Sequence, residues 1–102
     1  MATLHTVNKS PFERNALESC LRFTTPGSSV LLIEDGVVGA LRNSRLAPRI
    51  AQAMENITFY ALGPDIRARG LEESRIIDGI RIVDYAGFVD LTAEHDRVQA
   101  WL

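Results

Sequence analysis

Cys20 is the one cysteine of this 102-residue sequence, and a thiolate at this position could carry sulfur. Reactive cysteines usually lie at helix N-termini or in electropositive loops, where the thiolate is stabilised. Cys20 falls in the second half of a predicted helix, on or beside its apolar stripe, with Arg14 and Arg22 near it in sequence and Glu18 partly offsetting them. This placement favours an inert, buried thiol, although sulfur chemistry at Cys20 stays open on the residues alone.

The two histidines, His5 and His95, complete no catalytic or metal-binding pattern with Cys20. One cysteine excludes an internal disulfide, and no Cys/His spacing suits structural zinc. His5 lies in a predicted strand among residues that should be buried, which favours a hydrogen-bonded structural group over a base. His95 lies near the end of the last predicted helix, where we expect it to interact with the helix dipole and to face water.

Polar residues follow the predicted strands, at the edge where parallel sheets bind ligands. The segment 8–10 precedes a predicted helix N-terminus, which suits an anion, but a capped helix with a solvated Lys9 is the simpler interpretation. Glu34 and Asp35 resemble the acidic pair of receiver domains, yet the third strand ends without an acceptor aspartate, so turn and cap chemistry is preferred. The segment 36–39 lacks both the dinucleotide fingerprint and the P-loop lysine and hydroxyl, which argues against nucleotide binding.

Three residues near the C-terminus have simple structural interpretations. Asp84 is expected to cap the last helix, and Tyr85 to be a core aromatic. Trp101 is expected to anchor the tail or to fill an interface.

Short apolar runs alternate with helical patterns along the chain. Strands are predicted over residues 4–7, 30–33, 57–62 and 80–83, with a short edge strand over 98–101. The first helix is predicted from Ser10-Pro11, where Glu13 completes a capping box, to Pro26-Gly27. A second helix is predicted over about 37–41, with a hairpin at Asp35-Gly36 as the alternative. Further helices are predicted from Pro48, over 65–69 and after Asp84. The expected buried faces are Phe12, Ala16, Leu17, Cys20, Leu21 and Thr24 on the first helix, and Tyr85, Phe88, Val89 and Thr92 on the last. The alternation predicts an α/β fold, a mainly parallel sheet with helices on both faces.

Length and composition narrow the class of protein. A chain that is 46% hydrophobic, of this length, suits a single domain spanning residues 1–102, with a core that needs no metal or disulfide. A formal net charge of −2 argues against a general nucleic-acid binder, because phosphate neutralisation needs a basic surplus. No apolar run is long enough to cross a bilayer and no signal pattern opens the chain, so we expect a cytoplasmic protein.

Several short segments have a recognisable order and spacing. They are Leu4-His5-Thr6-Val7, Lys9-Ser10-Pro11-Phe12, Leu31-Leu32-Ile33-Glu34-Asp35-Gly36-Val37, Tyr60-Ala61-Leu62 with Asp65, Ala68-Arg69-Gly70-Leu71, Ile82-Val83-Asp84-Tyr85 with Phe88-Val89, Leu91-Thr92 with His95, and Trp101. Together these segments cover nearly the whole chain, and the sequence resembles the DsrH/TusB family.

The resemblance implies a small three-layer α/β/α domain with about five strands, acting as a subunit of a sulfur-relay, or persulfide sulfurtransferase, complex. Its partners would be DsrE/TusD-like and DsrF/TusC-like subunits, in a heterohexamer with two copies of each. Sulfur would pass as a cysteine persulfide to or from a DsrC/TusE-like carrier. The resemblance implies no metal or organic cofactor, and no direct contact with nucleic acid or a membrane.

Cys20 separates two functions within this family. The DsrH branch resembles this chain in having a cysteine on the first helix, so the main prediction is a DsrEFH-type subunit in dissimilatory sulfur oxidation, with Cys20 as its candidate catalytic, sulfur-carrying thiol. The alternative is a noncatalytic structural subunit of a TusBCD-type complex for wobble 2-thiouridine synthesis in tRNA, because the family places its principal persulfide cysteine on the DsrE/TusD-like subunit. An unrelated small-ligand or phospho-signalling domain is disfavoured by the missing phosphate loop and acceptor aspartate.

Overall fold

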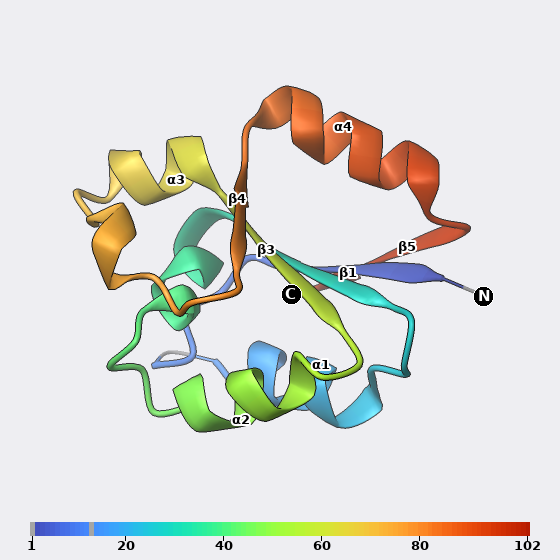
Figure 1. The fold of residues 1–102 in the computed structure, drawn as a ribbon, viewed down its shortest axis with the longest axis horizontal. Coiled ribbons are helices and arrows are strands. Elements are labelled where there is room, and N and C mark those ends of the chain that lie inside the picture. Colours follow the sequence, from blue (N-terminus) through green and yellow to red (C-terminus); the bar gives the residue numbers. More distant parts are fainter. Residues whose placement is uncertain (1, 13) are drawn as a thin grey trace.

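Five parallel strands form one sheet in the computed structural model, which describes residues 2–12 and 14–102 (Figure 1). The strand order is β4-β3-β2-β1-β5, so the last strand of the chain pairs with the first at one edge of the sheet. The strands are β1 Thr3–Val7, β2 Ser29–Leu32, β3 Thr58–Leu62, β4 Arg81–Val83 and β5 Arg97–Trp101. The predicted α/β fold with a parallel sheet is therefore confirmed.

Helices lie on both faces of the sheet. They are α1 Ala16–Phe23, the 3₁₀ helix η1 Glu34–Ala40, α2 Ala47–Ala53, α3 Gly63–Ala68, the 3₁₀ helix η2 Glu73–Arg75 and α4 Tyr85–Glu94. Figure 1 shows α1 and α2 below the sheet and α4 above it. Because η1 includes both Asp35 and Gly36, the helical interpretation of this segment is confirmed over the hairpin.

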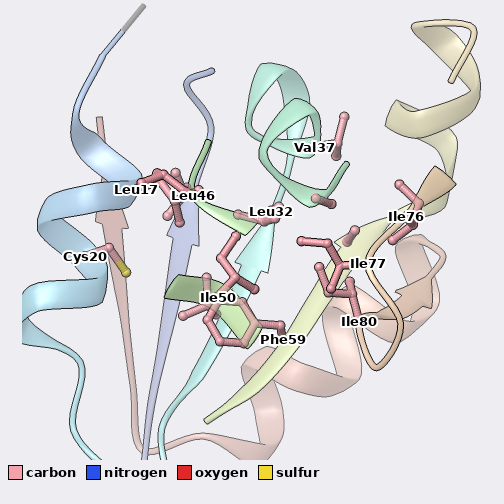
Figure 2. Close-up of a cluster of buried hydrophobic side chains, with 14 of the residues drawn as sticks. Leu17, Cys20, Leu32, Val37, Leu46, Ile50, Phe59, Ile76, Ile77 and Ile80 are labelled. Atoms are coloured by element: carbon pink, nitrogen blue, oxygen red, sulfur yellow. The ribbon is translucent and has the colours of Figure 1, made fainter. Parts of the chain in front are cut away.

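Alternation along the strands divides the core between the two faces. On one face Leu17 and Cys20 of α1 and Ile50 of α2 pack over the sheet, where Leu32 and Phe59 belong to the same cluster (Figure 2). On the other face α4 contributes Leu91, which packs with the buried strand residues Leu4 and Leu31. All four residues of β2 are buried, as expected of a strand covered on both sides.

The first helix begins later than predicted. The Ser10 hydroxyl accepts a hydrogen bond from the Phe12 amide at 3.2 Å, which closes a single turn, whereas regular helix begins at Ala16. Phe12, expected on the buried face, is 65% exposed because it lies on this turn. Glu13, the other half of the expected capping box, lies outside the described residues. The prediction of a helix start at Ser10-Pro11 is therefore wrong, because these residues form a turn.

The face that the last helix buries only partly matches the predicted one, since Phe88 and Thr92 are half-buried but Tyr85 and Val89 are not. Tyr85 and Val89 are 60% and 65% exposed, so Tyr85 is not a core aromatic. Leu91 is buried and Phe88 is half-buried against the same cluster. A stripe through residues 88, 91 and 95 therefore faces the sheet. This stripe and the predicted one both have helical spacing, so sequence periodicity alone does not choose between them.

No helix among the described residues is long and apolar enough to span a membrane.

Candidate functional site

Cys20 lies on the inner face of α1, one turn beyond Leu17, and its side chain is fully buried in the larger core cluster (Figure 2). The outer face of the same helix carries Glu18, which pairs with Arg49 of α2 at 3.1 Å. This division follows from the sequence, because apolar residues three and four apart share one side of a helix.

Thr24, one turn after Cys20, supplies the polar contact of the thiol. The Thr24 hydroxyl lies 3.5 Å from Sγ and donates a hydrogen bond to the Cys20 carbonyl. Burial raises the pKa of the Cys20 thiol to about 11, and the hydrogen bond with Thr24 offsets only part of that rise. Near neutral pH the side chain is therefore a protonated thiol shielded from solvent, which is the opposite of the environment that activates cysteines.

His5 makes its hydrogen bond with the far end of the chain. It is 5% exposed, and its Nδ1 accepts a hydrogen bond of 3.0 Å from Trp101 Nε1. Burial lowers the pKa of His5 below its ordinary value. The predictions of a hydrogen-bonded structural histidine and of a tryptophan that anchors the tail are both confirmed. Trp101 also stacks on Phe23 of α1, with ring centroids 6.3 Å apart and an interplanar angle of 11°.

His95 does not simply face water, contrary to the prediction. Its Nδ1 donates to the Leu91 carbonyl at 2.7 Å, and its Nε2 lies 2.9 Å from the hydroxyl of Ser29. The ring therefore joins the end of α4 to the start of β2. The prediction that His95 lies near the C-terminus of the last helix is confirmed. Its partner Ser29 is 66 residues away in the sequence, so no local sequence pattern could have indicated this hydrogen bond.

The helices that follow β2 and β3, η1 and α3, meet through an ion-pair network that was not predicted from the sequence. Glu34, at a left-handed φ of 50°, donates its backbone N–H to Asp65 at 2.6 Å. Arg69 binds Asp35 at 2.8 Å and lies 3.8 Å from Asp65. Asp65 of α3 and Arg69, which directly follows this short helix, are four residues apart, a spacing that favours such pairs and was the available signal. The network joins η1 to α3. Glu34 and Asp35 form the first turn of η1, but no side chain among the described residues caps this helix, and Asp35 pairs with Arg69 instead, so the cap part of the turn and cap interpretation is wrong.

The predicted role of Asp84 is confirmed, whereas the anion site suggested near Lys9 is not supported. Asp84 caps α4 as predicted, since its Oδ1 accepts from the Gly87 amide at 2.8 Å. Lys9 has no helix N-terminus beside it, because α1 begins only at Ala16, so the anion-site hypothesis loses its geometric basis. Among the residues that the structure describes, no group of three or more His, Cys, Asp and Glu side chains could hold a metal ion.

Solved structures share this arrangement of strands and helices. The ychN protein from Escherichia coli superposes with a TM-score of 0.79 at 18% identity, covering 98% of this chain and 99% of that one. A protein of unknown function from Methanobacterium thermoautotrophicum superposes with a TM-score of 0.76 at 16% identity, covering 96% and 97%. At these identities the likeness establishes the fold, a small parallel α/β domain with helices on both faces.

Sequence relatives establish the family. The model of the DsrH like protein family matches residues 9–98. Protein TusB of Pectobacterium parmentieri is 36% identical over 98 residues, covering 96% of this chain and 99% of that protein. Protein TusB of Escherichia coli O81 (strain ED1a) is 38% identical over the same length and coverage. The chain belongs to the DsrH/TusB family.

Proposed function

We propose that residues 1–102 act as one domain, a cytoplasmic noncatalytic subunit of a TusBCD-type sulfur relay for wobble 2-thiouridine synthesis in tRNA. The observation that carries this proposal is the 36–38% identity to proteins named TusB, over 96% of this chain and 99% of theirs. These relatives favour the tRNA-thiolation alternative over the predicted role in dissimilatory sulfur oxidation.

The burial of Cys20 supports a noncatalytic role. Persulfide transfer requires a thiolate to attack the outer sulfur of a donor persulfide, releasing the donor's thiolate. Cys20 is fully buried, and burial raises its pKa to about 11, so its environment opposes both formation of the thiolate and access of a donor. Sulfur would then be carried by a cysteine of a TusD-like partner.

The surface of the chain supports an assembly role. Among the described residues the exposed large hydrophobic side chains are Phe12, Phe23, Ile82, Tyr85, Val89, Val98 and Leu102. In addition β5 and β4 are the two edges of the sheet, and an uncovered edge strand is suited to interaction with another chain. We propose TusC-like and TusD-like subunits as the partners, two copies of each subunit in a heterohexamer, and a TusE-like protein as the carrier that receives the sulfur.

Cys20 as a sulfur-carrying thiol is the competing hypothesis, and one experiment separates the two. The chain is co-expressed with the TusC-like and TusD-like proteins of the same genome, as wild type, Cys20→Ser and Cys20→Ala, and sulfur transfer from the purified complex to the TusE-like carrier is measured.

A noncatalytic role predicts that both variants retain at least about half of the wild-type rate, since they change packing and not the chemistry. Loss of transfer in both variants, in complexes of unchanged native mass, would make Cys20 a relay thiol. Failure of the three proteins to co-purify would contradict the assembly role itself.

A further inference from the structure

We propose that the hydrogen bond between Trp101 and His5 is a pH-sensitive latch, which fastens the C-terminal end of β5 to the sheet at neutral pH and releases it on acidification. This device is independent of the proposed relay function. It rests on the position of β5, on the chemistry of the two rings, and on what surrounds His5.

β5 is held by few side-chain contacts. It is an edge strand and, in the part of the chain that the structure describes, it pairs only with β1, in parallel register with His5 opposite Gln99 and Val7 opposite Trp101. The side chains of residues 97–100 are exposed, whereas Trp101 is half-buried and packs against the larger core cluster. Trp101 therefore supplies the main side-chain attachment of this strand.

The hydrogen bond selects one protonation state of His5. An indole N–H can only donate, so Nδ1 of His5 must offer its lone pair, and the proton of the neutral ring must lie on Nε2. A second proton would have to add at Nδ1. It would replace the acceptor with an N–H that points at the N–H of Trp101, and the hydrogen bond would be lost.

No negatively charged neighbour among the described residues is paired with His5 to stabilise its protonated form. Across the ladder lie the uncharged Gln99 of β5 and Val30 of β2. The titratable group on the inner face of α1 is the buried Cys20 thiol.

The charged groups of these elements are paired or exposed to solvent. Glu18 pairs with Arg49, and Arg22 of α1 is exposed. Arg97 lies on the same face of β5 as Gln99 and is also exposed, and its positive charge would not stabilise a protonated His5. Within residues 2–12 and 14–102 no salt bridge includes His5, and burial keeps its pKa below 6.5.

His95 provides an internal contrast. Its Nδ1 already donates to the Leu91 carbonyl, and the Ser29 hydroxyl beside Nε2 can accept as well as donate. Both hydrogen bonds of His95 are therefore compatible with an N–H on the ring nitrogen that makes them. Of the two histidines in the chain, His5 is the one whose ring lone pair accepts from a group that can only donate.

Proton linkage gives the sign and size of the expected effect. The released His5 binds a proton more tightly than the latched one, so opening becomes easier as the pH falls. The opening equilibrium should increase with falling pH below 6.5, by at most about tenfold per pH unit, and level off below the pKa of the latched ring.

Amide hydrogen exchange of β5, corrected for intrinsic rates, tests this between pH 7.5 and pH 5. The expected result is a progressive loss of protection at residues 97–101 in wild type and in His95→Asn. In His5→Asn the protection should not vary with pH, because the Asn side-chain oxygen accepts but does not titrate. Equal pH dependence in wild type and His5→Asn, or none in wild type, would overturn the proposal.

A second variant keeps the proposal testable if His5→Asn does not fold. Trp101→Phe retains a ring to stack on Phe23 and removes the donor. The pKa of His5, followed by its ring-proton NMR resonance, should then rise toward its ordinary value because the bond that favours the neutral ring is gone. An unchanged or lower pKa of His5 in Trp101→Phe would contradict a latch.

Discussion

At the scale of single residues, the chemistry of the chain is decided by the neighbours of its few reactive groups. Cys20 has the type of side chain that carries sulfur, but α1 turns it into the core, next to Thr24. His5 has the type that serves as a general base, but its Nδ1 lone pair is occupied by Trp101. Both groups are used for packing or attachment in this conformation.

We expect Cys20 to resist thiol reagents in the folded chain. Raising the thiol pKa from 9.0 to about 11 lowers the thiolate fraction about 100-fold near neutral pH, and burial adds a steric barrier. The rate with an aromatic disulfide reagent at pH 7.5 should be at least about 100-fold lower in the native chain than in the urea-unfolded chain. Equal rates in the two states would show that the thiol is accessible.

The burial of these residues was predictable from the sequence, but their hydrogen-bond partners were not. The predicted strand over residues 4–7 was enough to place His5 among buried residues, and the apolar stripe of the first helix was enough to bury Cys20. The partners were beyond reach, since Trp101 is 96 residues from His5 and Ser29 is 66 residues from His95. Such contacts depend on which strands become neighbours, which no local pattern encodes.

At the scale of elements, the strands and most helix boundaries were predictable because their signals are local. A buried apolar run, Pro64 at the start of α3 and Asp84 before α4 each act within a few residues. The errors arose where two local solutions compete. Ser10-Pro11 suits a turn as well as a helix start, and α4 has two apolar stripes of which tertiary packing selects one.

Gly36 allows η1 to lie directly against the end of β1. A β-carbon at this position would be 2.1 Å from the carbonyl oxygen of Val7, which is rigid backbone. We therefore expect Gly36→Ala to lower the free energy of unfolding by at least about 3 kcal/mol, measured by urea denaturation.

The matched control is Gly39→Ala in the same helix. Its new β-carbon would meet the flexible end of the Leu17 side chain at 2.7 Å, which can move. Gly39→Ala should cost clearly less than Gly36→Ala. Equal costs, or no cost at Gly36, would contradict this account of the packing.

Asp84 should contribute the usual stabilisation of an N-cap to α4. Asp84→Ala removes the acceptor of the Gly87 amide and is expected to cost about 1 kcal/mol. Asp90→Ala, an exposed carboxylate inside the same helix, is the control and should change stability by less than about 0.5 kcal/mol. Chemical denaturation of the two variants side by side gives the comparison, and a larger loss for Asp90→Ala would argue against the cap.

At the scale of the whole molecule, the chain leaves both sheet edges and several apolar side chains uncovered. The C-terminal residues 98–102 combine the two features, since they belong to or follow edge strand β5 and include the exposed Val98 and Leu102. The strand order was not predictable, because the pairing of β5 with β1 brings together the two ends of the sequence.

Removing residues 98–102 should weaken assembly with the partner subunits. The expected result is a shift from the complex to smaller species in native mass spectrometry, with helix content by circular dichroism showing that the truncated chain still folds. Deletion of Leu102 alone, which leaves β5 intact, should have a smaller effect. An unchanged native mass after the longer truncation would count against an interface at this edge.

The most direct test of a noncatalytic role is the intact mass of this chain within its purified complex, after exposure to a persulfide donor, with and without reductant. The account predicts that the TusD-like partner gains one sulfur atom while this chain keeps its mass, in wild type and in Cys20→Ser alike. A reductant-labile gain of one sulfur atom on this chain, lost in Cys20→Ser, would contradict the account and establish Cys20 as a carrier of sulfur.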